Sequence, residues 1–349
     1  MDRRAFIRTG LTATAAVALG AGGCAGERKG TGGMGSFDGK VMTVSGAMDP
    51  DALGITLPHE HVLVDFIGAE DASPDRYDAE EAFQAILPHL EQVRALGCEA
   101  FVECTPAYIG RDAALVRRLA EASGLDMVVN TGYYGAADDK FVPGHAYEET
   151  VDQLADRWTA EWEAGIEDTG IRPGFIKSGV DSGPLSDIDA KLVRAAARTH
   201  LRTGLTMAVH TGGGVAALAE LEILEEEGVA PSAWIWVHAQ TEKDAEIHTR
   251  VAEAGGWLSF DGIGPTSIGQ HAGFVAEMKR RGFLDRVMIS HDAGWYRPGQ
   301  PNGGAFRPFD TLFTEFLPAL REAGLDEGEI HQVMVGNPAR AFTVGVRKA

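Results

Sequence analysis

Two histidines of metal-ligand type lie close together near the start of the sequence. They stand in the run His59-Glu60-His61, within an apolar stretch. If this stretch is a β-strand, residues two apart point to the same side, so His59 and His61 share one site while Glu60 faces away and supports the structure. Neutral imidazole nitrogens bind Zn²⁺ and other divalent transition metals. The spacing therefore indicates half of a metal site.

Four further residues of ligand or base type end later apolar runs. They are Lys177 in Phe-Ile-Lys-Ser, His210 in Ala-Val-His-Thr, His238 in Trp-Val-His and Asp292 in Ser-His-Asp. A single buried histidine is more often a hydrogen-bonded core residue than a ligand. The joint pattern favours one site, because 33 residues separate Lys177 from His210 and 28 separate His210 from His238. Each step is about one strand–helix unit.

The segments that must position these residues alternate between strand-like and helical patterns. Strands are expected at 54–65, 100–106, 126–134, 174–180, 205–210, 233–239, 256–263 and 286–292, with helical spacing between them and glycine at the helix ends. This alternation predicts parallel strands, an α/β fold and a (β/α)8 TIM barrel over residues 37–349. A doubly wound open sheet is the alternative, although no G-x-G-x-x-G follows the first strand.

A barrel brings the C-terminal ends of its strands to one mouth, where barrel enzymes have their active sites. Four imidazoles and a carboxylate suit Zn²⁺, Mn²⁺, Fe²⁺ or Co²⁺ better than Ca²⁺ or Mg²⁺. Five ligands exceed what one tetrahedral zinc with an open position accepts, and they suit two metals with a shared bridge. The pKa of Lys177 should fall among cations, and its neutral amine can take up CO2 to form a bridging carbamate. The alternative is a buried Lys177 paired with Asp292 beside one metal or none.

These residues resemble the phosphotriesterase family of the amidohydrolase superfamily, which includes aryldialkylphosphatases and phosphotriesterase-like lactonases. The resemblance covers residues 41–344. The run Gly-Ile-Thr-Leu-Pro-His-Glu-His-Val from Gly54 is similar to the first-strand signature of the family, and Asn-Pro-Ala-Arg-Ala-Phe from Asn337 is similar to its C-terminal segment. The resemblance implies a metal-dependent hydrolase with a binuclear centre, with zinc as the main expectation and manganese, cobalt or iron as alternatives.

The resemblance also assigns roles to the six residues. His59, His61 and Asp292 would hold the buried metal, His210 and His238 the exposed one, and carbamylated Lys177 would bridge them. A hydroxide between the metals would attack an ester-type bond, and Asp292 would accept its proton. Lys177 and Asp292 are therefore the predicted catalytic residues.

The expected substrate is a small lactone or other carboxylic ester, with slow promiscuous activity on phosphotriesters. Organophosphate-degrading members carry an aspartate and a histidine at positions that match Thr241 and Gly262 here. Two other readings use the same site: an amidase, or a hydrolase of a phosphodiester or sugar lactone. A third is a catalytically silent, lipid-tethered binding protein.

Residues near the predicted strand ends are expected to contact the substrate. Tyr133 and Tyr134 end the third strand and resemble a tyrosine that lactonase-like members place over the substrate. The loop after Asp292 offers two aromatic faces and a cation, and loops after barrel strands set specificity. The predicted contacts are Tyr133, Tyr134, Asp261, Trp295, Tyr296 and Arg297.

Neighbouring residues are expected to support the metal ligands. Asp65 and Glu103 are expected to orient the ligand histidines. His291 adjoins Asp292 on its strand and is expected to face the opposite side.

The first residues are typical of an export signal. Arg3 and Arg4 precede an apolar run at 11–21, which is shorter than the roughly 20 residues that span a bilayer. We therefore predict a twin-arginine signal peptide over residues 1–23. Ala-Gly-Gly-Cys resembles a lipobox, so Cys24 is the predicted lipidation site and residues 24–36 a Gly-rich tether. The protein would then be a membrane-anchored lipoprotein, or a periplasmic protein if cleavage occurs nearby without lipidation.

Composition limits the partners. The 51 acidic and 31 basic residues give a net charge of −20, which disfavours nucleic acid and anionic membrane surfaces. Contact with a membrane is expected only through the lipid anchor. Three cysteines cannot form a disulfide framework. Assembly into a homodimer is compatible with the sequence.

Overall fold

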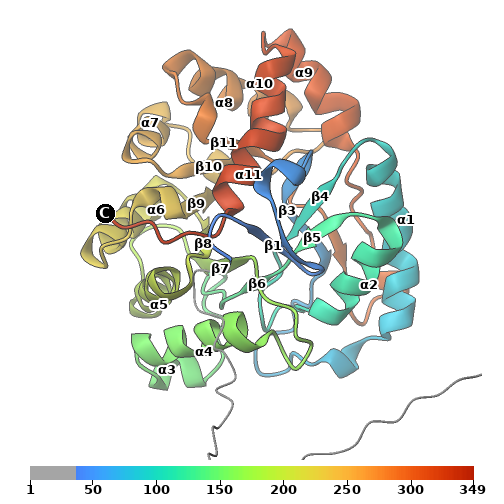
Figure 1. Ribbon diagram of the computed structural model, residues 1–349, viewed down its shortest axis with the longest axis vertical. Coiled ribbons are helices and arrows are strands. Elements are labelled where there is room, and N and C mark those ends of the chain that lie inside the picture. Colours follow the sequence, from blue (N-terminus) through green and yellow to red (C-terminus); the bar gives the residue numbers. More distant parts are fainter. Residues whose placement is uncertain (1–36) are drawn as a thin grey trace, which may run out of the picture. The chain divides into compact units, whose positions relative to one another are not determined.

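The computed structural model describes residues 37–349. The predicted signal peptide, the lipidation site Cys24 and the tether lie outside the described residues. Figure 1 shows the described chain as a set of parallel strands surrounded by helices, which is the predicted (β/α)8 barrel. None of the helices within residues 37–349 combines the length and apolar composition that crossing a membrane requires.

The barrel strands follow the predicted runs, and most are shorter than predicted. They are β3 Thr56–Leu63, β4 Ala100–Glu103, β5 Asp126–Val128, β6 Asn130–Thr131, β7 Phe175–Val180, β8 Thr206–Thr211, β9 Trp234–Val237, β10 Trp257–Phe260 and β11 Val287–Ile289, with β12 Gly294–Tyr296 after the last. The third predicted strand is divided at Val129 into β5 and β6. All pairings among these strands are parallel.

Strands β3, β11 and β12 close the barrel. β12 pairs with β3 through Gly294 opposite His61, and the amide of His61 donates to the carbonyl of Ala293 at 3.0 Å. Before β12, the amide of Asp292 donates to the carbonyl of His59 at 3.2 Å. The first and last strands therefore meet where the predicted ligands lie.

The helices cover the outside of the barrel. They are α1 Ala79–Ala95, α2 Ala113–Ser123, α3 His145–Glu148, α4 Val151–Ala164, α5 Asp187–Thr203, α6 Gly214–Glu226, α7 Ala245–Ala254, α8 Ile268–Arg281, α9 Leu317–Glu322, α10 Glu327–His331 and α11 Asn337–Phe342. Side-chain oxygens of Asp78, Asp112, Ser186 and Asp244 cap α1, α2, α5 and α7. Between β6 and β7 the chain forms two helices, α3 and α4, and Gly165 caps the C-terminus of α4.

Apolar side chains also fill the barrel interior. Phe175 and Ala208 belong to this inner core, and Phe342 from α11 packs with them. Lys177 and His210 follow Phe175 and Ala208 by two residues on the same strands. Because side chains alternate along a strand, these two polar groups also project into the barrel, beyond the apolar layer and toward the C-terminal ends.

Elements outside the strand–helix alternation were not predicted. A hairpin of β1 Val41–Thr43 and β2 Gly46–Met48 precedes the barrel. Two π-helical turns, Leu312–Phe316 and Gln332–Gly336, precede α9 and α11. Three residues of hairpin strand are too short for a periodic signal, and a π turn keeps the apolar spacing of an ordinary helix.

Gly294 lies where the closing strands approach most closely. Its φ is 94°, and a Cβ at this position would lie 1.7 Å from the carbonyl oxygen of His61. We predict that Gly294→Ala lowers the free energy of unfolding in urea by at least about 2 kcal/mol, because the contact and the backbone conformation both oppose a side chain. Gly273→Ala in α8, where a Cβ meets nothing within 4 Å, should be neutral or stabilising by up to about 1 kcal/mol. Equal effects of the two substitutions would contradict this account of the closure.

Candidate metal centre

The six predicted ligands meet in one cavity. His59, His61, Lys177, His210, His238 and Asp292 all line a cavity of about 330 Å³. They come from β3, β7, β8 and the segments that follow β9 and β11. Convergence of five separate segments is what a barrel mouth produces.

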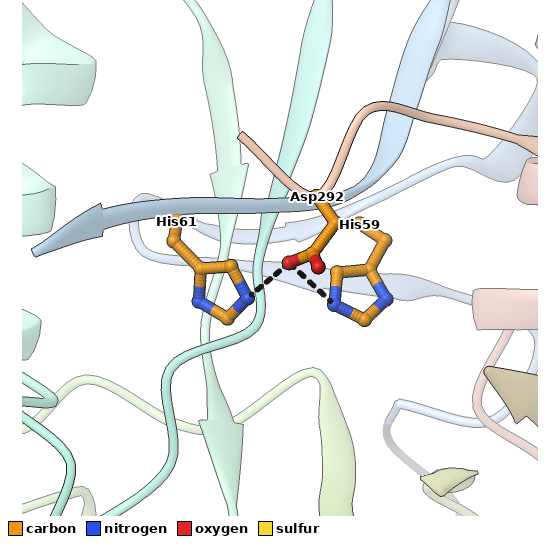
Figure 2. Close-up of side chains that lie close together, drawn as sticks. All are labelled: His59, His61 and Asp292. Carbon is orange, nitrogen blue, oxygen red and sulfur yellow. Dashed lines mark ion pairs between the residues drawn. The ribbon is translucent and has the colours of Figure 1, made fainter. Parts of the chain in front are cut away.

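His59, His61 and Asp292 form the tightest group, shown in Figure 2. Asp292 Oδ1 lies 3.0 Å from His61 Nε2 and 3.7 Å from His59 Nε2. One ligand atom from each residue lies within 4.8 Å of the others. These are the three residues predicted to hold the buried metal.

His210 and His238 lie beside this group. Their ring centroids are 4.4 Å apart, and the His238 ring is 5.1 Å from that of His59. Lys177 is 2% exposed, and its Nζ donates to the carbonyl of Ser178 at 3.2 Å. No carboxylate among residues 37–349 lies within ion-pair distance of this amine, so the alternative of a Lys177–Asp292 pair is not what the structure shows.

The histidine rings are oriented by groups behind them. His238 Nδ1 donates to Asp261 Oδ1 at 2.6 Å, and His59 Nδ1 lies 3.2 Å from Asp261 Oδ2. His61 Nδ1 bonds to the hydroxyl of Thr105 at 2.8 Å, and that hydroxyl donates to Glu103. With Nδ1 of each ring turned to these groups, Nε2 is the nitrogen that remains for a metal, and in His59 and His61 it lies toward Asp292 Oδ1. Rings held by carboxylates or hydroxyls in this way are typical of metal-binding histidines, so the residues fit a metal centre.

Burial sets the protonation of several ligands. It lowers the pKa of Lys177, and it lowers the pKa of His59 and, further, that of His210. The two histidines are therefore neutral near pH 7, the form that binds metals. For Lys177 the lowered pKa makes the neutral amine, the form that can react with CO2, easier to reach. Burial opposes ionisation of Asp292, but the hydrogen bond from His61 holds its pKa below the usual value. The set offers neutral nitrogens and an anionic oxygen to a cation.

Two ligands have a left-handed backbone conformation. The φ angles of His238 and Asp292 are 65° and 53°. Non-glycine residues adopt this region at a cost in free energy, and such residues concentrate at functional sites. Arg307 Nη1 donates to the carbonyl of Asp292 at 2.7 Å and helps to hold this conformation.

Glu60 and His291 face away from the cavity, as predicted. His291 Nδ1 donates to Glu60 Oε1 at 2.6 Å, and His291 Nε2 accepts the amide of Leu312 at 2.9 Å. Both ring nitrogens of His291 are thus engaged, and the ring is 1% exposed. It has no nitrogen free for a metal.

Of the six predicted substrate contacts, two line the cavity. Tyr134 and Trp295 line the cavity. Tyr133 points the other way, because neighbouring residues face opposite sides, and its hydroxyl bonds to His145 Nε2 at 3.1 Å. The other three predicted contacts, Asp261, Tyr296 and Arg297, do not line the cavity either.

Each of these three residues has a different position. Asp261 is fully buried behind the histidines, so its carboxylate orients ligands instead of contacting substrate. Tyr296 is 4% exposed and packs in the core. Arg297 lines a neighbouring cleft with Asp65, whose carboxylate pairs with Arg76 and not with a ligand histidine. Of the two predicted supporting acids, only Glu103 acts on a ligand.

Sequence reasoning missed most of the cavity wall. Some of the missed side chains follow the ends of β3 and β4 directly, and the others come from loops that carry no periodic signal; one cation, Lys140, lies among them. The missed lining residues are Val64, Phe66, Cys104, Pro106, Ile109, Ala137, Lys140 and Phe141. Whether a loop residue lines a cavity depends on the position of the loop in the folded structure, and the local sequence pattern does not specify that position.

Comparison with known proteins agrees with the site. A profile of the Phosphotriesterase family matches residues 39–342. The chain is 29% identical to the Phosphotriesterase homology protein of Escherichia coli, over 84% of this chain and 100% of that protein. It is 24% identical to the aryldialkylphosphatase of Saccharolobus solfataricus, over 83% and 95% of the two chains. It is also 24% identical to the N-acetyltaurine hydrolase of Dictyostelium discoideum, over 88% and 98%.

The barrel and its cluster of histidines and acids define a metal-dependent hydrolase of the TIM-barrel class. The chain belongs to the phosphotriesterase family.

Substitution of Asp261 tests how far the orientation of the histidine rings contributes to metal affinity, because Asp261 contacts the rings but does not line the cavity. We predict that Asp261→Asn weakens metal affinity by about 10- to 100-fold, because the amide removes the negative charge that faces both rings and the carboxylate that accepts from His238 Nδ1. Affinity would be measured by competition with a chromophoric chelator. The control is Asp126→Asn, because Asp126 is the first residue of β5 and lies at the end of the barrel away from the ligand residues. An unchanged affinity in Asp261→Asn would show that packing alone orients the rings.

Proposed function

We propose that this chain hydrolyses carboxylic esters, and lactones in particular, at a binuclear metal centre. The observation that carries the proposal is the convergence of the six ligand residues on one cavity with a largely apolar wall. Bound metals would supply a water-derived nucleophile at neutral pH and would polarise the scissile carbonyl. Carbamylation of Lys177 is part of the proposal, supported by its burial and its lowered pKa.

The side chains divide the remaining tasks. Asp292 Oδ1, directed toward His61 Nε2, is placed to accept a proton from the attacking water and to release it outward, since its side chain is 24% exposed. Tyr134 and Trp295 offer aromatic faces on which the apolar part of a substrate can pack. Phe66 and Phe141 extend this apolar wall.

The wall favours esters over amides. Apart from the six ligands, the titratable side chains that line the cavity are Cys104, Tyr134 and Lys140. Burial raises the pKa of Cys104 and that of Tyr134, so neither donates a proton readily near neutral pH. An amine leaving group must be protonated before it departs, whereas an alkoxide leaves more easily.

Phosphotriester turnover is proposed to be slow. The hydroxyl of Thr241 donates back to the carbonyl of His238 at 2.8 Å and offers no acid or base to the cavity. A Cβ at Gly262 would lie 2.8 Å from Gln240 Nε2. Two hydrogen bonds hold the Gln240 side chain to Asp261, so it is not free to move away. A side chain that could shuttle protons therefore has no room at this position.

An amidase remains the second candidate. It is favoured by the similarity to proteins named N-acetyltaurine hydrolase, which extends over 88% of this chain. With Lys177 carbamylated, Lys140 is the one lysine that lines the cavity as a cation, and it could pair with an anionic group on such a substrate. A panel of lactones, esters and N-acyl amino compounds distinguishes the two candidates.

We also propose that the protein is exported by the twin-arginine route and retained through Cys24. The support is the order of paired arginines, short apolar run and cysteine in residues 1–24. Globomycin-sensitive processing and palmitate labelling would test it.

Lys177→Ala tests the metal bridge. We predict that bound metal falls from about two ions per chain and that lactone turnover falls at least about a hundredfold, because the bridging anion is lost. Elemental analysis of protein expressed with added bicarbonate gives the metal content. Lys279→Ala, which removes a surface ion pair with Glu329, is the control. Full activity of Lys177→Ala would overturn the bridging role.

The loop after Asp292 gives a second test. Trp295→Ala should raise KM for a lactone with an apolar substituent by about tenfold, because the ring lines the cavity. Arg297→Ala should leave KM nearly unchanged, because Arg297 lines the neighbouring cleft. If Arg297→Ala raised KM and Trp295→Ala did not, the cavity lined by Trp295 would not be where the substrate binds.

A further inference from the structure

Three carboxylates form a second cluster, separate from the six ligand residues. Asp139 lies in the loop after β6, Asp181 directly follows β7, and Asp189 lies in the first turn of α5. One carboxylate oxygen from each lies within 4.8 Å of the others. The cluster therefore joins two consecutive barrel units, the loop after β6 and the β7–α5 unit, outside the cavity.

Asp189 is the buried member of this cluster. It is 2% exposed, and its Oδ1 is enclosed by protein without accepting any hydrogen bond. A Cβ at Gly135 would lie 2.4 Å from this oxygen, so the glycine is what allows the carboxylate to reach the loop backbone. A buried carboxylate oxygen without a partner is unfavourable unless a cation neutralises it.

The protein supplies no such cation among the described residues. Asp139, Asp181 and Asp189 form no ion pair there, and nearby Lys191 donates instead to the carbonyls of Ala146 and Tyr147. Burial raises the pKa of Asp139 and that of Asp189, and a neighbouring carboxylate of the cluster adds to each rise. Three acids this close repel one another without a positive charge between them.

We propose that Asp139, Asp181 and Asp189 bind a calcium ion. The donors are oxygens only, which hard cations prefer and zinc-type metals do not. Three carboxylates can supply up to six oxygens, and the partly exposed Asp139 and Asp181 leave room for water to complete the six to eight ligands of calcium. Calcium is favoured over Mg²⁺, because ligands from three separate segments do not impose the strict octahedron that magnesium needs.

The cluster is connected to the catalytic cavity through one loop. Asp181 Oδ1 accepts the amide of Ala137 at 2.8 Å, and its Oδ2 accepts the amide of Asp138 at 3.0 Å. Ala137, Asp138 and Asp139 all have positive φ, at 66°, 55° and 60°. The same loop supplies Ala137, Lys140 and Phe141 to the cavity wall. A bound calcium would fix this strained loop and so hold that wall in place.

Calcium binding is measured on the full chain with its transition metals loaded. Calorimetric titration with CaCl2 should give one ion per chain with Kd of about 1 mM or tighter, and the thermal midpoint should rise with calcium. Terbium, excited through Tyr147 beside Asp139, should luminesce when bound and be displaced by calcium. These measurements do not require turnover, so their outcome does not depend on whether the protein hydrolyses esters.

Asp189→Asn and its neighbour Asp187→Asn form the matched pair, since both remove an acid from the first turn of α5. Asp189→Asn should weaken calcium binding at least about tenfold, and Asp187→Asn should not. Without calcium, Asp189→Asn should melt no lower than the wild type, because repulsion is removed. A role in helix capping alone would lower that midpoint. Asp139→Asn, which alters a less buried member, repeats the binding test if Asp189→Asn does not fold.

Three results would overturn the proposal. One is the absence of saturable calcium binding up to about 10 mM, roughly ten times the Kd of weak calcium modules. Another is binding that Asp189→Asn and Asp139→Asn retain. The third is equal weakening by Asp189→Asn and Asp187→Asn, which would show general attraction to an acidic surface.

Discussion

The metal centre depends on one buried carboxylate at the closure of the barrel. Glu60 is fully buried and accepts hydrogen bonds from Ser290 Oγ, from the amide and Nδ1 of His291, and from the amide of Ala293. These bonds tie the first strand to the segment that carries Asp292. A charge buried this deeply is tolerated because each oxygen is satisfied. The distance between Asp292 and the two ligand histidines of β3 follows from this closure.

Around this closure, buried carboxylates lie behind the histidine rings and give the site a negative charge that bound cations would neutralise. Asp261 sits between His59 and His238, and although burial opposes its ionisation, the two rings hold the pKa of Asp261 well below its usual value. The same carboxylate raises the pKa of His238 despite the burial of that ring. Glu103 differs, since burial raises its pKa to about 7. The acids behind the rings thus balance the charge that metals would bring.

The residues of the cavity wall are held in place in a different way from the predicted ligands. Ligands lie on strands or directly after them, where backbone hydrogen bonds to neighbouring strands fix their positions. The wall comes from loops, such as the one between Gly135 and Phe141, that are held by side-chain contacts. Loops can change without disturbing the barrel, so one ligand set can serve different substrates within a family. Anchoring of this loop by Asp181 is therefore a means of defining the wall.

The sequence by itself determined the alternation of strands and helices and predicted the six residues that meet in the cavity. Alternation in β-strands gives His59 and His61 one direction, and glycine and capping residues mark the helix ends, so local rules were sufficient. Tertiary structure alone decided that Asp261 lies behind the histidines, that Tyr134 and not Tyr133 is the one that faces the cavity, and that Asp139, Asp181 and Asp189 meet. These outcomes depend on where separate segments lie in space. Contacts between residues far apart in the chain have no periodic signature.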